Sequence, residues 1–279
     1  MRKIINIVFV LCAVVATMNA AQPAMGWDIF EVGVQGGGTV MTGGKNFASE
    51  LGCTTGLNLD YRYLTQVADG VEMGPKIGLG ASYNQAHLRS LTDTWTHPWI
   101  SDKGINMVDT LHLQGKESLT QWQIELPVMM AMNIRGCVIN VGVIPVLGIQ
   151  QQHLTQLDNL QANTCIEIVD VAFPHTLVVR EDKARIQPQF HLMVGAEIGY
   201  EWSFKQQHRL GVQAFCRYDV LPMQPWSKDP FCEWQQNELV VGSLTQVFAD
   251  KLHSLDFGIR LYYAFASPHN YRRLGLLPL

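Results

Sequence analysis

The segment Ile186–Trp202, IQPQFHLMVGAEIGYEW, decides the fold because its side chains alternate in polarity along its whole length. Every even position is apolar or aromatic, and every odd position except Met193 is polar, charged or glycine. Successive side chains of a strand point to opposite faces, so one face suits hydrocarbon and the other suits water or a polar network. Soluble strands average about 5 to 6 residues, whereas a bilayer crossing needs roughly 9 to 11. The segment is therefore predicted to be a strand of a membrane-spanning β-barrel.

Seven further segments show the same two-sided pattern, with Phe215 as one apolar exception on a polar face. They are Phe30–Gln35, Thr54–Tyr63, Lys76–Asn84, Gln121–Met130, Ile139–Val143, Arg209–Asp219 and Leu255–Phe265. Eight strands are an even number, as a closed antiparallel barrel requires. The predicted fold class is all-β: an eight-stranded antiparallel transmembrane β-barrel.

The links between these strands alternate between long and short. The long links are 37–53, 85–119, 149–185 and 221–251, and the short ones are 64–71, 133–136 and 203–208. Outer-membrane barrels alternate long extracellular loops with short periplasmic turns. We therefore expect long extracellular loops, short periplasmic turns and both chain termini in the periplasm.

The first 21 residues have the composition of a secretory signal, because Arg2 and Lys3 precede an apolar run and small residues follow it. The expected division is a signal peptide over 1–21, an outer-membrane β-barrel over 22–266 and a periplasmic tail over 267–279. Removal of the signal leaves 18 basic and 24 acidic residues, a balance that argues against nucleic-acid binding. The expected location is the outer membrane of a Gram-negative cell, with outer-membrane lipid as a partner.

A soluble β-barrel or sandwich is the alternative, because its strands also alternate, with the apolar side turned inward. Aromatic residues weigh against it, because they gather where the strands would meet the two membrane interfaces. The periplasmic set is Trp27, Tyr61, Tyr63, Tyr200, Trp202, Tyr263 and Phe265, and the outer set is Tyr83, Trp122 and Tyr218. Pro127, Pro145 and Pro188 fall inside predicted strands, so we expect bulges or shorter strands there.

The chain resembles the PorT-type and OmpA-like outer-membrane β-barrel family over roughly Trp27 to Phe265. The resemblance rests on the strand order, on the Ile124–Pro127 segment, which is similar to a Glu-aliphatic-Pro strand of the family, and on the patterns at Gly195–Tyr200 and Arg217–Tyr218. It implies an integral outer-membrane protein of a group in which some members are linked to protein secretion at the cell surface. The peptidoglycan-binding domain of longer OmpA-like proteins does not follow the barrel.

An eight-stranded barrel is just wide enough for its own side chains, so the charged residues of the polar faces must share its interior. They are Glu31, Asp60, Arg62, Lys76, Glu125, Glu197, Glu201, Arg209, Arg217, Asp219, Asp256 and Arg260. Unpaired ions in such an interior cost several kcal/mol each, so we expect interlocking salt bridges and a plugged polar lumen. Seven acids against five bases leave a narrow, cation-preferring water path as the alternative.

No cofactor or metal site is expected, because the histidines lack metal-ligand spacing and the glycines at 36–38 and 43–44 do not complete a phosphate loop. Five cysteines remain after the signal, and a disulfide among Cys53, Cys165 and Cys232 is open because sequence alone does not fix connectivity.

Three classes of function remain. The favoured one is a structural or interaction barrel, an accessory to secretion or surface assembly, whose loops bind a surface or periplasmic protein, a glycan or a ligand. The candidate loop aromatics are Trp95, Trp99, Trp226, Phe231 and Trp234. The alternatives are a lipid-modifying enzyme and a narrow diffusion channel. Catalysis is not expected, because the neighbours His253–Ser254 and Ser101–Asp102 form no triad.

Overall fold

The computed structural model describes residues 26–42, 47–90, 94–100, 103–166, 171–175, 177–179, 189–204, 207–221, 232–235, 238–241 and 252–269. All of its regular elements in these ranges are β-strands. A search of the same ranges for a helix with the length and apolarity to cross a membrane gave none.

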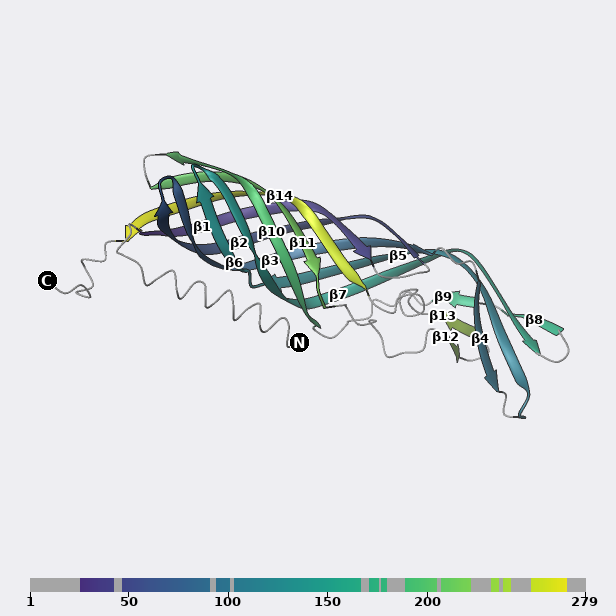
Figure 1. Cartoon of the computed structure of the whole chain (residues 1–279). Coiled ribbons are helices and arrows are strands. Elements are labelled where there is room, and N and C mark those ends of the chain that lie inside the picture. The colour runs from purple at the N-terminus through teal and green to yellow at the C-terminus, as the bar shows by residue number, and fades with distance from the viewer. Residues whose placement is uncertain are drawn as a thin grey trace.

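The main sheet closes into a barrel with eight positions around its wall (Figure 1). In order around the wall these are β1 (Gly26–Thr42), β2 (Phe47–Ala68), β3 (Val71–Ser90), β5 (Asn106–Glu125) together with β6 (Val128–Ile134), β7 (Cys137–Ile166), β10 (Gln189–Phe204), β11 (His208–Asp219) and β14 (His253–His269). Neighbouring strands are antiparallel, and β1 pairs with β14 from Gly26 opposite His269 to Thr42 opposite His253. The predicted eight-stranded antiparallel barrel is therefore confirmed.

The fourth position of the wall is built from two strands, because the chain leaves strand geometry at Leu126 and Pro127. The longer β5 pairs with β3 from Gly80 to Arg89, and β6 pairs with β3 from Val71 to Ile77. This is one of the places where a shorter strand is expected from proline. At the second, Pro145, β7 continues without a break opposite Leu192. The third, Pro188, lies outside the described residues.

Short turns join the strands at one end of the barrel, which we call the turn end. Asp69 and Gly70 connect β2 to β3, and Arg135 and Gly136 connect β6 to β7. Arg135 and Gly136 have φ values of 50° and 93°. Positive φ at both central residues is the geometry of a type I′ turn, which matches the twist of the two strands and favours glycine. β1 begins and β14 ends at this same end, since Gly26 lies opposite His269.

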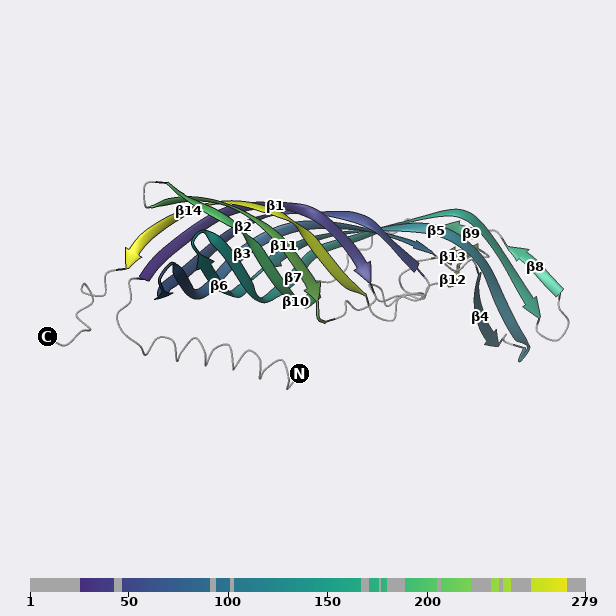
Figure 2. The same cartoon turned by 45° about the horizontal axis from the view of Figure 1, so that its top comes forward.

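At the opposite end, segments predicted to be loops are strands in the structure. The outer parts of β5 and β7 leave the barrel and continue as a hairpin whose pairing reaches Met107 opposite Ile166. β4 (Thr94–Ile100) pairs with β5, and β8 (Val171–His175) pairs with β7. We call β4, β8 and the outer parts of β5 and β7 the projecting sheet. Figures 1 and 2 show it extending beyond the barrel wall. A second small sheet contains β12 (Cys232–Gln235), β13 (Glu238–Val241) and β9 (Leu177–Val179).

The barrel has an apolar outside and a largely polar inside. Along β10, Phe190, Val194 and Ile198 are 42 to 64% exposed, while His191, Glu197 and Glu201 are at most 3% exposed. The two exceptions to the sequence pattern, Met193 and Phe215, keep to the interior and are buried. The direction of the alternation is therefore the reverse of that in a soluble barrel, where apolar side chains fill the core.

Candidate functional site

The candidate site is the charged interior of the barrel. All twelve residues expected to share the lumen are at most 6% exposed. They come from seven strands: Glu31 on β1; Asp60 and Arg62 on β2; Lys76 on β3; Glu125 on β5; Glu197 and Glu201 on β10; Arg209, Arg217 and Asp219 on β11; Asp256 and Arg260 on β14. Strands far apart in sequence thus supply one interior network.

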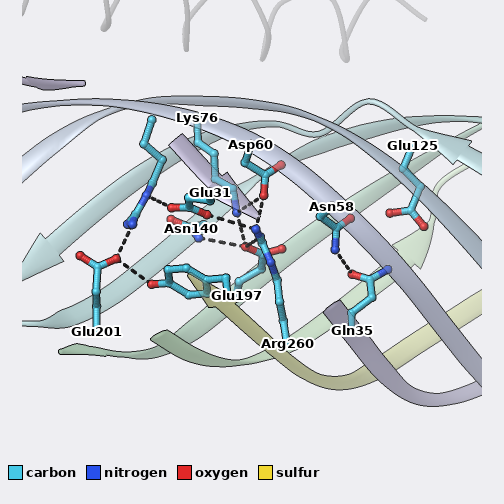
Figure 3. A network of polar contacts seen from close by, with 12 residues as sticks. Glu31, Gln35, Asn58, Asp60, Lys76, Glu125, Asn140, Glu197, Glu201 and Arg260 are labelled. Carbon is cyan, nitrogen blue, oxygen red and sulfur yellow. Dashed lines mark hydrogen bonds and ion pairs between the residues drawn. The ribbon is translucent and has the colours of Figure 1, made fainter. Parts of the chain in front are cut away.

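Glu197 is the hub of this network (Figure 3). One of its carboxylate oxygens lies 2.7 Å from Lys76 Nζ and 3.3 Å from Arg260 Nη1, and the other lies 3.5 Å from Arg217 Nη2. Asn140 Nδ2 donates a further hydrogen bond of 2.9 Å to the same carboxylate. Three cations from β3, β11 and β14 therefore converge on one acidic side chain.

A second group of contacts lies toward the turn end. Arg62 forms ion pairs with Glu31 and Glu201. Arg209 Nη1 lies 2.8 Å from the other oxygen of Glu201, and the Tyr262 hydroxyl donates a 2.8 Å hydrogen bond to that carboxylate. Glu31 in turn lies 3.1 Å from Arg260, so the two groups form one continuous network.

Asp60 and Glu125 complete the pairing. Asp60 contacts Arg260 and lies 3.5 Å from Lys76, and Glu125 Oε2 lies 2.7 Å from Arg217 Nη1. Five cations, Arg62, Lys76, Arg209, Arg217 and Arg260, are thus each paired with members of a set of five carboxylates, Glu31, Asp60, Glu125, Glu197 and Glu201. The formal charges of this part of the lumen cancel.

Asp219 and Asp256 lie apart from the balanced network. Asp256 accepts hydrogen bonds from Thr39 and, at 3.2 Å, from Asn84. Asp219 lies 2.6 Å from His191 Nδ1 and accepts a 2.8 Å hydrogen bond from the Ser254 hydroxyl. Within the part of the chain that the structure describes, neither carboxylate has an Arg or Lys in an ion pair. The two acids in excess over the bases therefore lie together toward the end opposite the turns.

Uncharged side chains complete the network, and the list of charged residues missed them. Gln35 accepts hydrogen bonds from Arg217 at 2.7 Å and Asn58 at 3.0 Å, and Ser82 donates to Glu125. Asn140 and Tyr262 contact the acids Glu197 and Glu201 as described above. All five residues occupy alternate positions of their strands that point into the barrel. The alternation in the sequence could therefore have identified them as lumen residues.

The lumen also has an apolar layer at the turn end. Ile29, Leu64, Ala131, Tyr262, Ala264 and Ala266 form a buried cluster there, and Trp27 packs against it. Trp27 was predicted to belong to the periplasmic aromatic rim, and this is wrong, because it lies on the inward face of β1. Arg209 sits over its ring at 5.6 Å from the centroid. The charged network is therefore closed on the turn side by packed apolar side chains.

Other rim aromatics do lie on the outside of the barrel. Tyr200 and Trp202 are 44% and 46% exposed, and the centroids of their rings lie 5.1 Å apart. At the other end Tyr83 and Trp122 contact at the same distance. A shallow groove of about 560 Å³ also marks the outer face and is lined chiefly by outward aliphatic residues such as Val34, Leu57 and Leu261. The outside thus presents an apolar belt with aromatic residues toward both ends.

The five candidate loop aromatics are not brought together by anything that the structure describes. The backbones of Trp95 and Trp99 lie on β4 and that of Trp234 lies on β12. Their side chains, together with Trp226 and Phe231, lie outside the described part of the chain. Among the cysteines that the structure describes, Cys53, Cys137 and Cys216 are free. The side chains of Cys165 and Cys232 lie outside the described part of the chain, so a disulfide between these two stays a prediction.

The neighbouring residues considered for catalysis have other contacts. Ser254 donates to Asp219, whereas His253 stacks on Tyr218 at 5.6 Å and lies 2.9 Å from the Asp219 carbonyl oxygen. Their side chains point to opposite faces of β14, as adjacency along a strand requires. Ser101 and Asp102 lie outside the described residues.

No protein-family model matches the chain, and the search of curated proteins gave no significant match. Solved structures similar to this chain include Ail, the attachment invasion locus protein of Yersinia pestis, in complex with the heparin analogue sucrose octasulfate; it is 10% identical, the match covers 88% of this chain and all of that one, and the TM-score is 0.31. Neisserial surface protein A is also 10% identical, with 84% and 95% covered and a TM-score of 0.27. The translocator domain of the autotransporter NalP from Neisseria meningitidis is 9% identical, with 95% and 97% covered and a TM-score of 0.23.

Proposed function

We propose that this protein is an integral outer-membrane β-barrel with a plugged lumen and a structural or interaction role at the cell surface. The observation that carries the proposal is the inversion of polarity across the wall. Val32, Leu57 and Ile259 are 58 to 64% exposed on the outside, whereas Arg62, Lys76 and Arg260 are at most 1% exposed on the inside. A monomer in water does not expose so continuous an apolar belt, but a bilayer covers it.

The proposed orientation, export and accessory role are supported by the positions of the strand ends and by the sequence. β1 and β14 start and end at the turn end, and short turns face the periplasm in outer-membrane barrels. Both termini are then periplasmic, the signal over 1–21 directs export, and the projecting sheet lies outside the cell. The resemblance to the PorT-type and OmpA-like family adds an accessory role in secretion or surface assembly.

The plugged lumen follows from charge and packing together. The five paired cations fill the middle, and the cluster of Ile29, Leu64 and Ala264 fills the turn end. Planar-bilayer recording tests this directly, and the purified protein is expected to insert without steady conductance. Large, steady openings would contradict the plug, and a small cation-selective conductance would favour the narrow channel instead.

The interaction role is assigned to the projecting sheet, since β4 and β8 form its two edges. Strand edges carry unpaired backbone groups that bind extended segments of other proteins. Its test is co-purification from detergent-solubilised outer membranes, with the full chain compared with a barrel that lacks the projecting sheet. A stoichiometric partner with the full chain alone is expected. A partner bound equally by both proteins would contradict the assignment, and lipid-modifying activity of a lone monomer would favour an enzyme.

A further inference from the structure

The barrel wall is higher on one side than on the other. Tyr83 and Trp122 lie opposite each other on the outward faces of β3 and β5, and the ladder between these strands continues past them to Arg89 opposite Lys116. On the other side of the barrel, β11 ends one residue after the rim aromatic Tyr218. The outward face of β3 and β5 therefore extends beyond the outer aromatic residues.

This extension is higher than the headgroup layer of a phospholipid bilayer. Arg89 is the sixth residue after Tyr83, which corresponds to roughly 20 Å along a strand. At the usual strand tilt of about 35 to 45°, the rise along the membrane normal is about 15 Å. Interfacial aromatic rings lie at the level of the headgroups, and the headgroup layer is only about 5 to 8 Å thick on each side. Arg89 therefore lies at the height of the sugars that outer-leaflet glycolipids carry above the bilayer surface.

Two cations lie side by side at this height. Arg89 and Lys116 are directly opposite each other, and both side chains are exposed. Like charges in opposite positions destabilise a sheet. Glu50 offsets one of the two charges, since its Oε1 lies 3.8 Å from Lys116 Nζ. Within the described ranges of the chain Arg89 has no ion pair, so one positive charge is left for an external anion.

Uncharged polar side chains cover the wall between the aromatic residues and the two cations. Gln85 and His87 lie on the outward row of β3, and Ser118 and Thr120 lie on that of β5. Gln85 Nε2 donates a 3.3 Å hydrogen bond to Ser118 Oγ. Amides, hydroxyls and imidazoles both donate and accept hydrogen bonds, as sugar hydroxyls require. We call the outward surface of β3 from Gln85 to Arg89 and of β5 from Lys116 to Thr120 the raised face.

We propose that the raised face binds a phosphorylated sugar of an outer-leaflet glycolipid, with the phosphate between Arg89 and Lys116. The inference rests on the proposed membrane location and names the lipid that contacts this side of the barrel. Arginine presents paired N–H groups that match two phosphate oxygens, and lysine supplies a second positive charge. The phosphate offsets the repulsion between the two cations, and the amide and hydroxyl groups of the raised face contact the sugar.

Lipid retention by the full chain tests the proposal. The protein is inserted into nanodiscs of phosphatidylcholine and a lipopolysaccharide with phosphorylated core sugars, and the lipids that stay on the released protein are measured by native mass spectrometry. The wild type is expected to retain the lipopolysaccharide. Two other lipids are compared: the same lipopolysaccharide without core phosphates, and phosphatidylglycerol, whose phosphate lies at the bilayer surface. Both are expected to be retained at least five-fold less.

Variants of the two cations assign the site. One charge near an anionic surface changes affinity roughly five-fold, so R89Q and K116Q should each lower retention of the phosphorylated lipopolysaccharide by about that factor, and R89Q/K116Q by more. K103Q is the matched control, because Lys103 is exposed in the turn between β4 and β5, away from the raised face. E50Q removes the anion beside Lys116, and it is expected to raise retention.

Membrane insertion is scored separately, by the mobility shift of unheated samples on denaturing gels. A chain that does not insert contradicts the membrane location and this inference with it. For inserted protein, equal retention by the wild type and R89Q/K116Q would show that the two cations are not the site. An equal loss in K103Q would indicate general charge attraction instead. Phosphatidylglycerol retained as well as the lipopolysaccharide would place the ligand at the bilayer surface and overturn the assignment to a sugar phosphate.

Discussion

Glu197 is the side chain on which the interior charge balance depends most. Its carboxylate is shared by Lys76, Arg217 and Arg260. Replacement by glutamine keeps the shape but leaves three buried cations without their common anion. Removal of one partner from a buried ion pair costs roughly 3 to 5 kcal/mol, so E197Q is expected to lower the free energy of unfolding by about that amount. Denaturant unfolding in phospholipid vesicles, followed by tryptophan fluorescence, measures it.

The control for E197Q is E50Q, which removes the same charge from an exposed ion pair. Glu50 lies 3.8 Å from Lys116, and the two side chains are 43% and 53% exposed. Exposed pairs contribute roughly 0 to 1 kcal/mol, so E50Q should change stability by less than about 1 kcal/mol. Equal losses in the two variants would show that the buried network is not what holds the barrel together.

Gly211 is required by the Tyr262 ring. A Cβ at position 211 would overlap the ring, which is fixed by its hydroxyl bond to Glu201 and by Arg62 and Arg260 over its face. Overpacking of a filled interior costs roughly 1 to 3 kcal/mol, so G211A is expected to be destabilised by that amount in the same unfolding assay. G36A is the control, because its Cβ would meet its nearest atom, Thr54 O, at 4.0 Å. A neutral G211A would show that the ring is free to move.

At the scale of the element, β10 tests which solvent surrounds the barrel. Ala196 lies on its outward row, between Tyr200 of the predicted periplasmic rim and Val194, which is opposite Tyr218 of the predicted outer rim. Phe204 lies beside the turn. Arginine on the lipid face costs roughly 2 to 4 kcal/mol at the midplane and 0 to 1 near the interface. A196R should therefore lose about 2 to 4 kcal/mol in vesicles, and F204R much less. If A196R is as stable as the wild type, water and not lipid faces this row.

The strands of the barrel were predictable because the wall separates two solvents. Each residue then has one of two environments, and period-two alternation records which one it occupies. Even Met193 and Phe215 obey the parity, since they lie inside despite being apolar. Met193 packs with Met129, Ile144 and Val146, and the Arg217 guanidinium lies 4.8 Å from the centroid of the Phe215 ring. The charged members of the lumen follow from the same rule, but their pairing partners do not.

The projecting sheet was not predictable, because the sequences of its strands do not alternate between apolar and polar residues. Between Gln150 and Ile166, β7 reads QQQHLTQLDNLQANTCI, which has no regular alternation. A strand outside the bilayer has no hydrocarbon on either face, so nothing forces every second residue to be apolar. The split at Pro127 was anticipated only as an irregularity, since the sequence does not show that β6 would continue the same wall.

At the scale of the whole molecule, the contacts that stabilise the barrel lie in other parts of the chain than the projecting sheet. The pairings that close the ring use β3 up to Arg89, β5 from Lys116, β7 up to Gln156 and β10 from Gln189. The ion pairs of the balanced network all lie within these limits. The barrel therefore contains its own stabilising contacts, and the projecting sheet adds to them only through β5 and β7.

We expect the barrel to fold without the projecting sheet. Replacement of residues 90–115 by a two-residue Asn-Gly turn joins Arg89 to Lys116, which already lie opposite each other. Deletion of 157–179 keeps the β7 residues 150–156, which pair with β5 in the wall. Shorter links cost less closure entropy, so the shortened protein should refold into vesicles and unfold within about 1 kcal/mol of the full chain. Refolding is scored by the mobility shift of unheated samples on denaturing gels. A shortened chain that stays unfolded where the full chain refolds would show that the ladder beyond the wall is needed to form the barrel.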